Sequence, residues 1–192
     1  MNAPSHVAMG IGAWSLVASL LSWPLTAVGV GVAGLASLTP DIDHPQSTVG
    51  RAVPFLSWPI RLVFGHRGVT HSLFGWLAVA VALWWLLPPE YELLAWAALV
   101  GYASHLLGDY MTVSGVPLLW PRGQNYRSPL PFQTGGVVEF LVASAILMAI
   151  WSAVGGWEKV GDDLGQYLAP ATRHEMHNFW RMLEGAWGVL FG

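Results

Sequence analysis

The chain has no cysteine and few charged residues. Of its 192 residues, 10% are charged and eight are Lys or Arg. Without cysteine, disulfide bonds and thiolate zinc sites are excluded. The net charge of −3 and the lack of a basic stripe argue against binding to nucleic acids. Protein ligands for a metal ion must therefore be sought among imidazoles and carboxylates.

Apolar sequence, by contrast, is in excess. The chain is 54% hydrophobic, contains 12 Trp and has a mean hydropathy of +0.50, which is typical of a polytopic membrane protein. Residues 7–39 contain no charge, and Ser22-Trp23-Pro24 divides them in two. Residues 73–87, 93–107 and 137–151 each approach the ~17 to 25 residues that cross a bilayer as a helix. We expect an all-α integral membrane bundle of about four to five membrane-embedded helices.

Two connections and a C-terminal tail lie outside these segments. The first connection contains an apolar stretch, 52–64, bordered by arginines, and we predict an interfacial helix there. The second, 110–135, contains four prolines and is too broken for long regular structure. The end of the chain is first polar and then aromatic, with a spacing that predicts an amphipathic helix on the membrane surface. We therefore divide the chain into a membrane-embedded domain, 1–155, and a tail, 156–192.

Polar residues are concentrated in five places at the ends of apolar segments. An unpaired charge beside hydrocarbon costs on the order of several kcal/mol, so a common purpose must compensate for this placement. The purpose we infer is one metal site at a membrane face. The five clusters are His6, then Asp41 with Asp43 and His44, then His66 with Arg67 and His71, then His105 with Asp109, and finally Glu139.

Counting the crossings places all five clusters on one face of the membrane. The first cluster precedes the first apolar segment, the second and third follow two crossings, and the last two follow two more. That face carries Arg51, Arg61, Arg67, Arg122 and Arg127, whereas the other carries Lys159, Arg173 and Arg181 of the tail. The positive-inside rule then makes the clustered face cytoplasmic.

His105 and Asp109 are the most specific candidate ligand pair. On a helix, residues four apart project from one side, so both can bind one ion. Asp41 and Asp43 offer oxygen ligands suited to Zn, Mn or Fe alongside imidazole. His71 stands at the expected start of a helix, where a ligand is held rigidly. Plainer explanations also exist, namely a helix cap for Asp109, core packing for His105, and a helix-terminating turn for the two acids of the second cluster.

Other residues are candidates for catalysis. Arg67 is planar and bidentate, which suits a phosphate, although it also fits the positive-inside pattern. Arg127 is assigned the same role. Glu139 lies three residues into an apolar segment, where an acid is functional by default. Asp43 or Glu139 would act as general base or as an additional ligand.

The candidate ligands outnumber the four that one zinc ion needs. Either two ions bind, or some residues orient the ligands instead of binding. The sequence does not decide between these, nor whether His44 and His66 are ligands. The residues predicted to surround one point, roughly 8 Å across, are His6, Asp41, His71, His105 and Asp109.

Four motifs, taken in order, resemble the YdjM-like family of predicted inner-membrane metal-dependent hydrolases. They are residues 38–45 (LTPDIDHP), 65–72 (GHRGVTHS), 101–105 (GYASH) continuing to Asp109, and 115–121 (GVPLLWP). The resemblance runs from His6 to about Glu139. It implies a helical hydrolase embedded in the membrane.

More distantly, the order of His and Asp residues is similar to that of the helical zinc phospholipase C fold. That resemblance implies zinc ligands at Asp41 or Asp43, His71, His105 and Asp109, with His6 as an N-terminal ligand. The downstream His and His-x-x-x-Glu ligands of that fold have no counterpart in this chain unless Glu139 serves.

We therefore expect a metal-dependent hydrolase in the bacterial inner membrane. One or two zinc ions, or Mn or Fe, would activate water for attack on a phospholipid or another amphiphilic phosphoester. Two other functions fit the same residues. One is a non-catalytic membrane protein whose metal clamps helix ends, and the other is a transporter or proton relay.

Overall fold

The structure is a computed structural model that describes residues 1–166, 178 and 181–182. The described part of the chain is all-helical apart from two isolated β-bridges, as the sequence predicts. Its α-helices are α1 (Ala3–Leu20), α2 (Ala27–Ala36), α3 (Thr48–Ala52), α4 (Pro54–Phe64), α5 (Leu73–Leu86), α6 (Glu92–Tyr110), α7 (Val137–Ala153) and α8 (Gly156–Gly165). Short 3-10 helices lie between them at η1 (Thr39–Asp43), η2 (Val69–His71) and η3 (Pro89–Tyr91).

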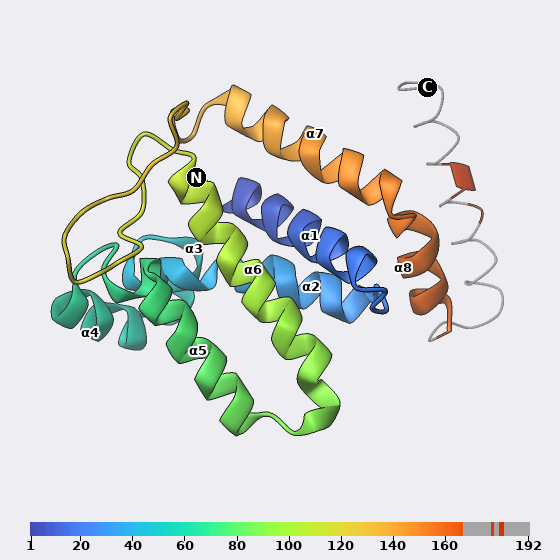
Figure 1. Cartoon of the computed structure of the whole chain (residues 1–192), viewed down its shortest axis with the longest axis horizontal. Helices are drawn as coiled ribbons and strands as arrows, with labels where there is room; N and C mark the ends of the chain where they lie inside the picture. The colour runs from blue at the N-terminus through green and yellow to red at the C-terminus, as the bar shows by residue number, and fades with distance from the viewer. Residues whose placement is uncertain (167–177, 179–180, 183–192) are drawn as a thin grey trace.

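Helix α6 lies at the centre of the molecule, packed against α1 and α2 on one side and α5 on the other (Figure 1). Helix α7 runs along α1, and α8 turns back toward α2. At four of the helices a side chain fixes the helix start, because its oxygen accepts a hydrogen bond from a free backbone N–H of the first turn. Asn2 caps α1, Thr26 caps α2 and Ser72 caps α5.

One hydrophobic core joins α1, α2, α6, α7 and α8. Its buried members include Trp14 of α1, Ala33 of α2, Ala97 of α6 and Trp151 of α7. Helix α8 contributes Val160 to the same core. The predicted division between a domain and a tail falls at the α7–α8 turn, and the predicted amphipathic C-terminal helix lies largely outside the described residues.

Several local predictions are confirmed. The break predicted near Ser22 separates α1 from α2, and the stretch 52–64 contains a helix, α4. The interfacial position of α4 stays a prediction. No α-helix interrupts residues 111–136. Taken singly, none of the helices in the described ranges combines the length and apolar character needed to cross a bilayer, whereas α7 from Glu139 together with α8, bent by 72°, passes that test as a pair. The number of membrane-embedded helices stays a prediction.

Gly101 sets how closely α6 approaches α2. A Cβ atom at this position would collide with the backbone carbonyl of Ala33. We expect Gly101→Ala to lower the free energy of unfolding by about 1 to 3 kcal/mol, because the backbones must separate. Denaturant unfolding in detergent measures the change.

The matched control is Gly31→Ala in α2, where an added Cβ meets nothing within 4 Å. This variant should be neutral or more stable, since alanine favours a helix by about 1 kcal/mol over glycine. Equal stability of the two variants would contradict the close contact at Gly101.

Candidate metal centre

The candidate ligands converge where the start of α1 meets the end of α6 (Figure 1). Helix α1 brings His6, and the last turns of α6 bring His105 and Asp109. The two 3-10 helices add Asp41 from η1 and His71 from η2. The structure therefore brings together all five residues that the sequence predicts around one point.

Three side-chain atoms have the spacing of metal ligands, and a fourth lies close to two of them. Nε2 of His71 and Nε2 of His105 are 3.2 Å apart, and Oδ1 of Asp41 lies 3.4 and 3.7 Å from them. Oδ2 of Asp109 lies 3.8 Å from both nitrogens. Tetrahedral ligands about 2.0 to 2.1 Å from zinc are separated by roughly 3.3 Å. The distances among Asp41, His71 and His105 are close to that value, and the Asp109 oxygen lies slightly farther from the two nitrogens.

His6 flanks this group. Its ring is stacked on that of His105, with centroids 3.6 Å apart, and its Nε2 lies 3.5 Å from Oδ1 of Asp109. The α-amino group of Met1 lies 2.6 Å from the same Oδ1. His6, His105 and Asp109 thus form a second group of possible ligands. The Nε2 atom of His105 can bind one ion at a time. The group with His6 and the group with Asp41 and His71 therefore cannot both use His105 to hold an ion at once.

Both ring nitrogens of His6 are buried in this centre and make no hydrogen bond to any described residue. Oδ2 of Asp109 also makes no hydrogen bond, but it is ion-paired with the Arg67 guanidinium at 3.0 Å. Leaving a buried polar atom unsatisfied costs about 1 to 3 kcal/mol, so native proteins rarely keep such atoms without a partner. A metal ion is a partner that matches their position and chemistry, and the residues present therefore fit one.

Backbone and hydroxyl groups fix which nitrogen of each central histidine faces the centre. Nδ1 of His105 lies 2.6 Å from the carbonyl oxygen of Ser37, which can only accept, so Nδ1 carries the proton. The hydroxyl of Thr70 donates to Asp43 and so accepts from Nδ1 of His71 at 3.1 Å. Both Nε2 atoms are left free to bind metal, as in metal sites whose histidines are held from behind.

Asp43 lies behind His71. Its carboxylate is fully buried, and Oδ2 accepts hydrogen bonds from the Thr70 hydroxyl at 2.6 Å and the Arg67 backbone N–H at 2.8 Å. Oδ1 lies 3.3 Å from Nδ1 of His66. The geometry favours an orienting role for Asp43, whereas the sequence predicts a ligand or base.

The charges of this group are mutually dependent. Burial alone would raise the pKa of Asp43, but hydrogen bonds from His66, His71 and Thr70 hold that pKa well below its usual value. Burial alone would lower the pKa of His71, whereas hydrogen bonds to Asp41 and Asp43 raise it to about 9. Without an ion, Asp43 therefore stays ionised and His71 carries a compensating positive charge near neutral pH, and a metal that binds Nε2 of His71 would displace the proton on that nitrogen.

Arg67 lies at the edge of the centre. Its Nη2 is 3.0 Å from Oδ2 of Asp109, and its Nη1 donates to the carbonyl of Gly115 at 3.3 Å. The backbone of Arg67 is left-handed, with φ of 57°. Its side chain is 25% exposed, so the guanidinium is accessible to a ligand that approaches the centre from outside.

Two predicted catalytic residues lie apart from these contacts. Glu139 is buried, but its oxygens accept from the backbone N–H groups of Asn2 and Gly135, both at 2.8 Å, so it ties α7 to the start of α1. Arg127 is exposed and donates to the carbonyl of Val113 at 3.5 Å. The catalytic roles of both stay predictions.

Sequence reasoning missed two groups that position the ligands. The role of Thr70 is signalled only by its place between Arg67 and His71. The Ser37 contribution is a backbone carbonyl, which leaves no signal in the residue type.

Comparison with known proteins places the chain among membrane proteins of one family. The model of that family, described as "YdjM inner membrane protein", matches residues 1–169. The chain is 37% identical to "Inner membrane protein YdjM" of Escherichia coli (strain K12), over 79% of this chain and 81% of the relative. It is 35% identical to "Uncharacterized protein YvsG" of Bacillus subtilis (strain 168), over 78% of this chain and 91% of the relative. No solved structure matches the chain.

Proposed function

The chain belongs to the YdjM family, and we propose that it is a metal-dependent hydrolase of the bacterial inner membrane that acts on an amphiphilic phosphoester. The observation that carries the proposal is the convergence of Asp41, His71 and His105, whose ligand atoms lie within reach of one ion, with an Asp109 oxygen close to both histidines. Their atoms are 3.2 to 3.8 Å apart in the pairs measured. Zinc is the ion that this mixture of imidazole and carboxylate suits best, with Mn or Fe as alternatives.

A divalent ion in such a site lowers the pKa of a bound water and polarises the centre under attack. The protein's own residues orient the reactants. Asp43 and Thr70 hold His71, and the carbonyl of Ser37 holds His105. Arg67 lies beside Asp109 with a partly exposed guanidinium, where it would bind a phosphate oxygen and neutralise developing charge.

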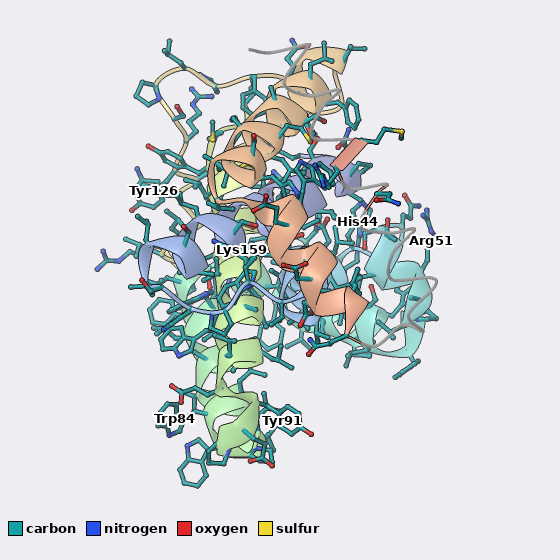
Figure 2. The ribbon with its side chains drawn as sticks, turned by 90° about the vertical axis from the view of Figure 1, so that its right-hand side faces the viewer. His44, Arg51, Trp84, Tyr91, Tyr126 and Lys159 are labelled. Carbon is teal, nitrogen blue, oxygen red and sulfur yellow. The ribbon has the colours of Figure 1, made fainter. Side chains whose placement is uncertain are left out.

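Exposed apolar side chains support a place in the membrane. Helix α4 packs against η1, which carries Asp41, and exposes Phe55, Leu62 and Val63. Exposed aromatic residues also gather at the tip of the α5–α6 hairpin, where Figure 2 shows Trp84 and Tyr91. Together with the names of its relatives, these exposed apolar surfaces support an inner-membrane protein. We propose that its metal centre lies near the lipid headgroups. A phospholipid-like substrate follows from that position.

A metal clamp without catalysis is the second candidate. The observation that favours it is that four protein ligands would complete a tetrahedral shell, as in structural zinc sites. Against it stands Asp41, whose side chain is 24% exposed and leaves one ligand accessible to solvent. A transporter or proton relay is less consistent, because the ionisable groups gather at the end of α6 instead of along its length.

Metal removal tests the centre itself. Protein purified in detergent is expected to contain zinc, or another divalent ion, bound tightly enough to survive gel filtration. A metal present at about 100 times its Kd stabilises the fold by about 2.7 kcal/mol. Chelation with EDTA should therefore lower the melting temperature by roughly 5 to 10 °C for a chain of this size.

Adding zinc back should restore the melting temperature, while Mg²⁺ should not, because it prefers all-oxygen ligands. Absence of metal in the purified protein, together with an unchanged melting temperature in EDTA, would refute the metal centre.

A hydrolysis assay separates the enzyme from the clamp. The metal-loaded protein is given bis(p-nitrophenyl) phosphate, or phospholipids in vesicles, as the substrate. Tight metal binding with no turnover on any phosphoester would favour the clamp.

A further inference from the structure

Five imidazole rings form a row from the protein surface to the buried centre. Consecutive ring centroids are 4.7 Å apart for His44 and His66, 6.3 Å for His66 and His71, 5.1 Å for His71 and His105, and 3.6 Å for His105 and His6. The side chain of His66 is 39% exposed, whereas the inner three are 0 to 1% exposed. The row therefore runs from solvent inward.

The two outer rings lie outside the metal centre. His44 follows η1, on the side of the molecule that Figure 2 shows with Arg51, and His66 lies in the turn between α4 and η2. Nδ1 of His66 faces Asp43, which leaves its Nε2 free. Nδ1 of His44 accepts a long hydrogen bond of 3.4 Å from the backbone N–H of Gln46. Water can replace this exposed contact at little net cost, so the ring of His44 is free to turn toward a ligand.

Carboxylates connect this outer pair to the centre. Asp43 contacts His66 through Oδ1 and His71 through Oδ2, each at 3.3 Å. Asp41, only three residues before His44, is 24% exposed, while Asp109, His71 and His105 are 0 to 1% exposed. An ion bound between the outer rings would thus be attracted inward by two negative charges.

The Asp109 side of the centre is less favourable for a cation. Nη2 of Arg67 lies 3.0 Å from Oδ2 of Asp109, so a fixed positive charge stands on that side. It would repel an incoming divalent ion and favour an anionic substrate instead. We therefore expect a cation to reach the centre past His44 and His66 and an anionic substrate to bind beside Arg67.

We propose that His44 and His66 form a surface capture site for a divalent transition-metal ion and pass it to Asp41, His71 and His105. The proposal rests on the metal centre proposed above, but not on its catalytic activity. Neutral imidazole pairs bind Zn, Co, Ni and Cu in preference to Mg or Ca. Transfer needs only ligand exchange, with no redox step.

The rate of metal loading tests this role. Metal-free full-length protein in detergent is mixed with Zn²⁺ or Co²⁺, and uptake is followed by competition with a chromophoric chelator or by the Co²⁺ absorption bands. We expect the double variant His44→Ala, His66→Ala to slow metal loading by about tenfold or more. A surface site that raises the local ion concentration increases the association rate by at least about tenfold, and the variant loses this increase. The metal content at equilibrium should be unchanged, because the four inner ligands remain.

His44→Ala alone is the cleaner variant, since His66→Ala also removes a partner of Asp43. It should slow loading without changing the final affinity. Gln46→Ala is the control, because it removes a neighbouring exposed side chain and keeps both rings. Unchanged loading rates in His44→Ala and the double variant would overturn the capture site, as would a lower affinity with an unchanged rate. If the unmodified protein takes up no metal, the centre fails and the capture site fails with it.

Discussion

His105→Ala is expected to abolish metal binding and hydrolysis together. His105 belongs to two groups of possible ligands. One group is His105 with His6 and Asp109, and the other is His105 with Asp41 and His71. Its Nε2 lies 3.2 Å from His71 and within 3.8 Å of Asp41 and Asp109. Removing this shared ligand takes one coordinating nitrogen from either possible arrangement, so the affinity for the ion falls and the ion is lost.

Metal content by atomic emission and phosphoester turnover measure the two losses. Both should fall to background in the variant. Leu107→Ala is the matched control, since it shortens an exposed side chain on the same helix and keeps the ligands. It should retain metal and turnover. A His105→Ala protein that folds, with full metal content, would show that the four-atom shell is not the binding site.

The loss of metal in His105→Ala should also appear as a loss of its EDTA sensitivity. The unmodified protein loses stability when the ion is removed, whereas the variant has no ion to lose. This difference separates loss of the ion from general damage to the fold.

The sequence was sufficient to identify the helical class and the convergence of ligands. When apolar segments pack antiparallel, the polar clusters at their ends lie at the same end of the bundle. Counting the expected crossings therefore predicts that His6 lies near His105. The pair His105 and Asp109 follows from helical periodicity alone. These inferences depend on local geometry that the residue types determine.

Roles within the centre depend on contacts that no local pattern determines. Asp41 and Asp43 are equivalent in sequence, but 3-10 geometry turns Asp41 toward Nε2 of His71 and Asp43 toward its Nδ1. Glu139 was predicted at the centre because buried acids are costly, and that cost is instead offset by two backbone N–H groups. Membrane crossing also cannot be predicted from a local pattern, because it depends on how short helices pair as well as on their composition.

Arg67→Ala is expected to separate catalysis from metal binding. A guanidinium has no lone pair to offer a cation, so Arg67 cannot be a ligand. Its removal deletes the partner of Oδ2 of Asp109, which is then free for the ion, and metal content should be retained. The backbone N–H that supports Asp43 is unaffected by the substitution. Turnover of a phosphoester should fall by about tenfold or more, as expected for one lost charge-stabilising group.

Arg127→Ala provides the comparison. Arg127 also belongs to the predicted cytoplasmic face, but its side chain is exposed and donates a long hydrogen bond of 3.5 Å to the carbonyl of Val113. Its loss should leave turnover nearly unchanged if the contacts seen in the structure decide the role. Arg67→Lys should recover only part of the activity, since lysine keeps the charge but loses the bidentate geometry. If Arg67→Ala unfolds the protein, or leaves turnover intact, the ion pair with Asp109 is structural, and the phosphate-binding role is refuted. If Arg127→Ala reduces turnover as strongly, charge on this face is sufficient and the specific position of Arg67 is not required.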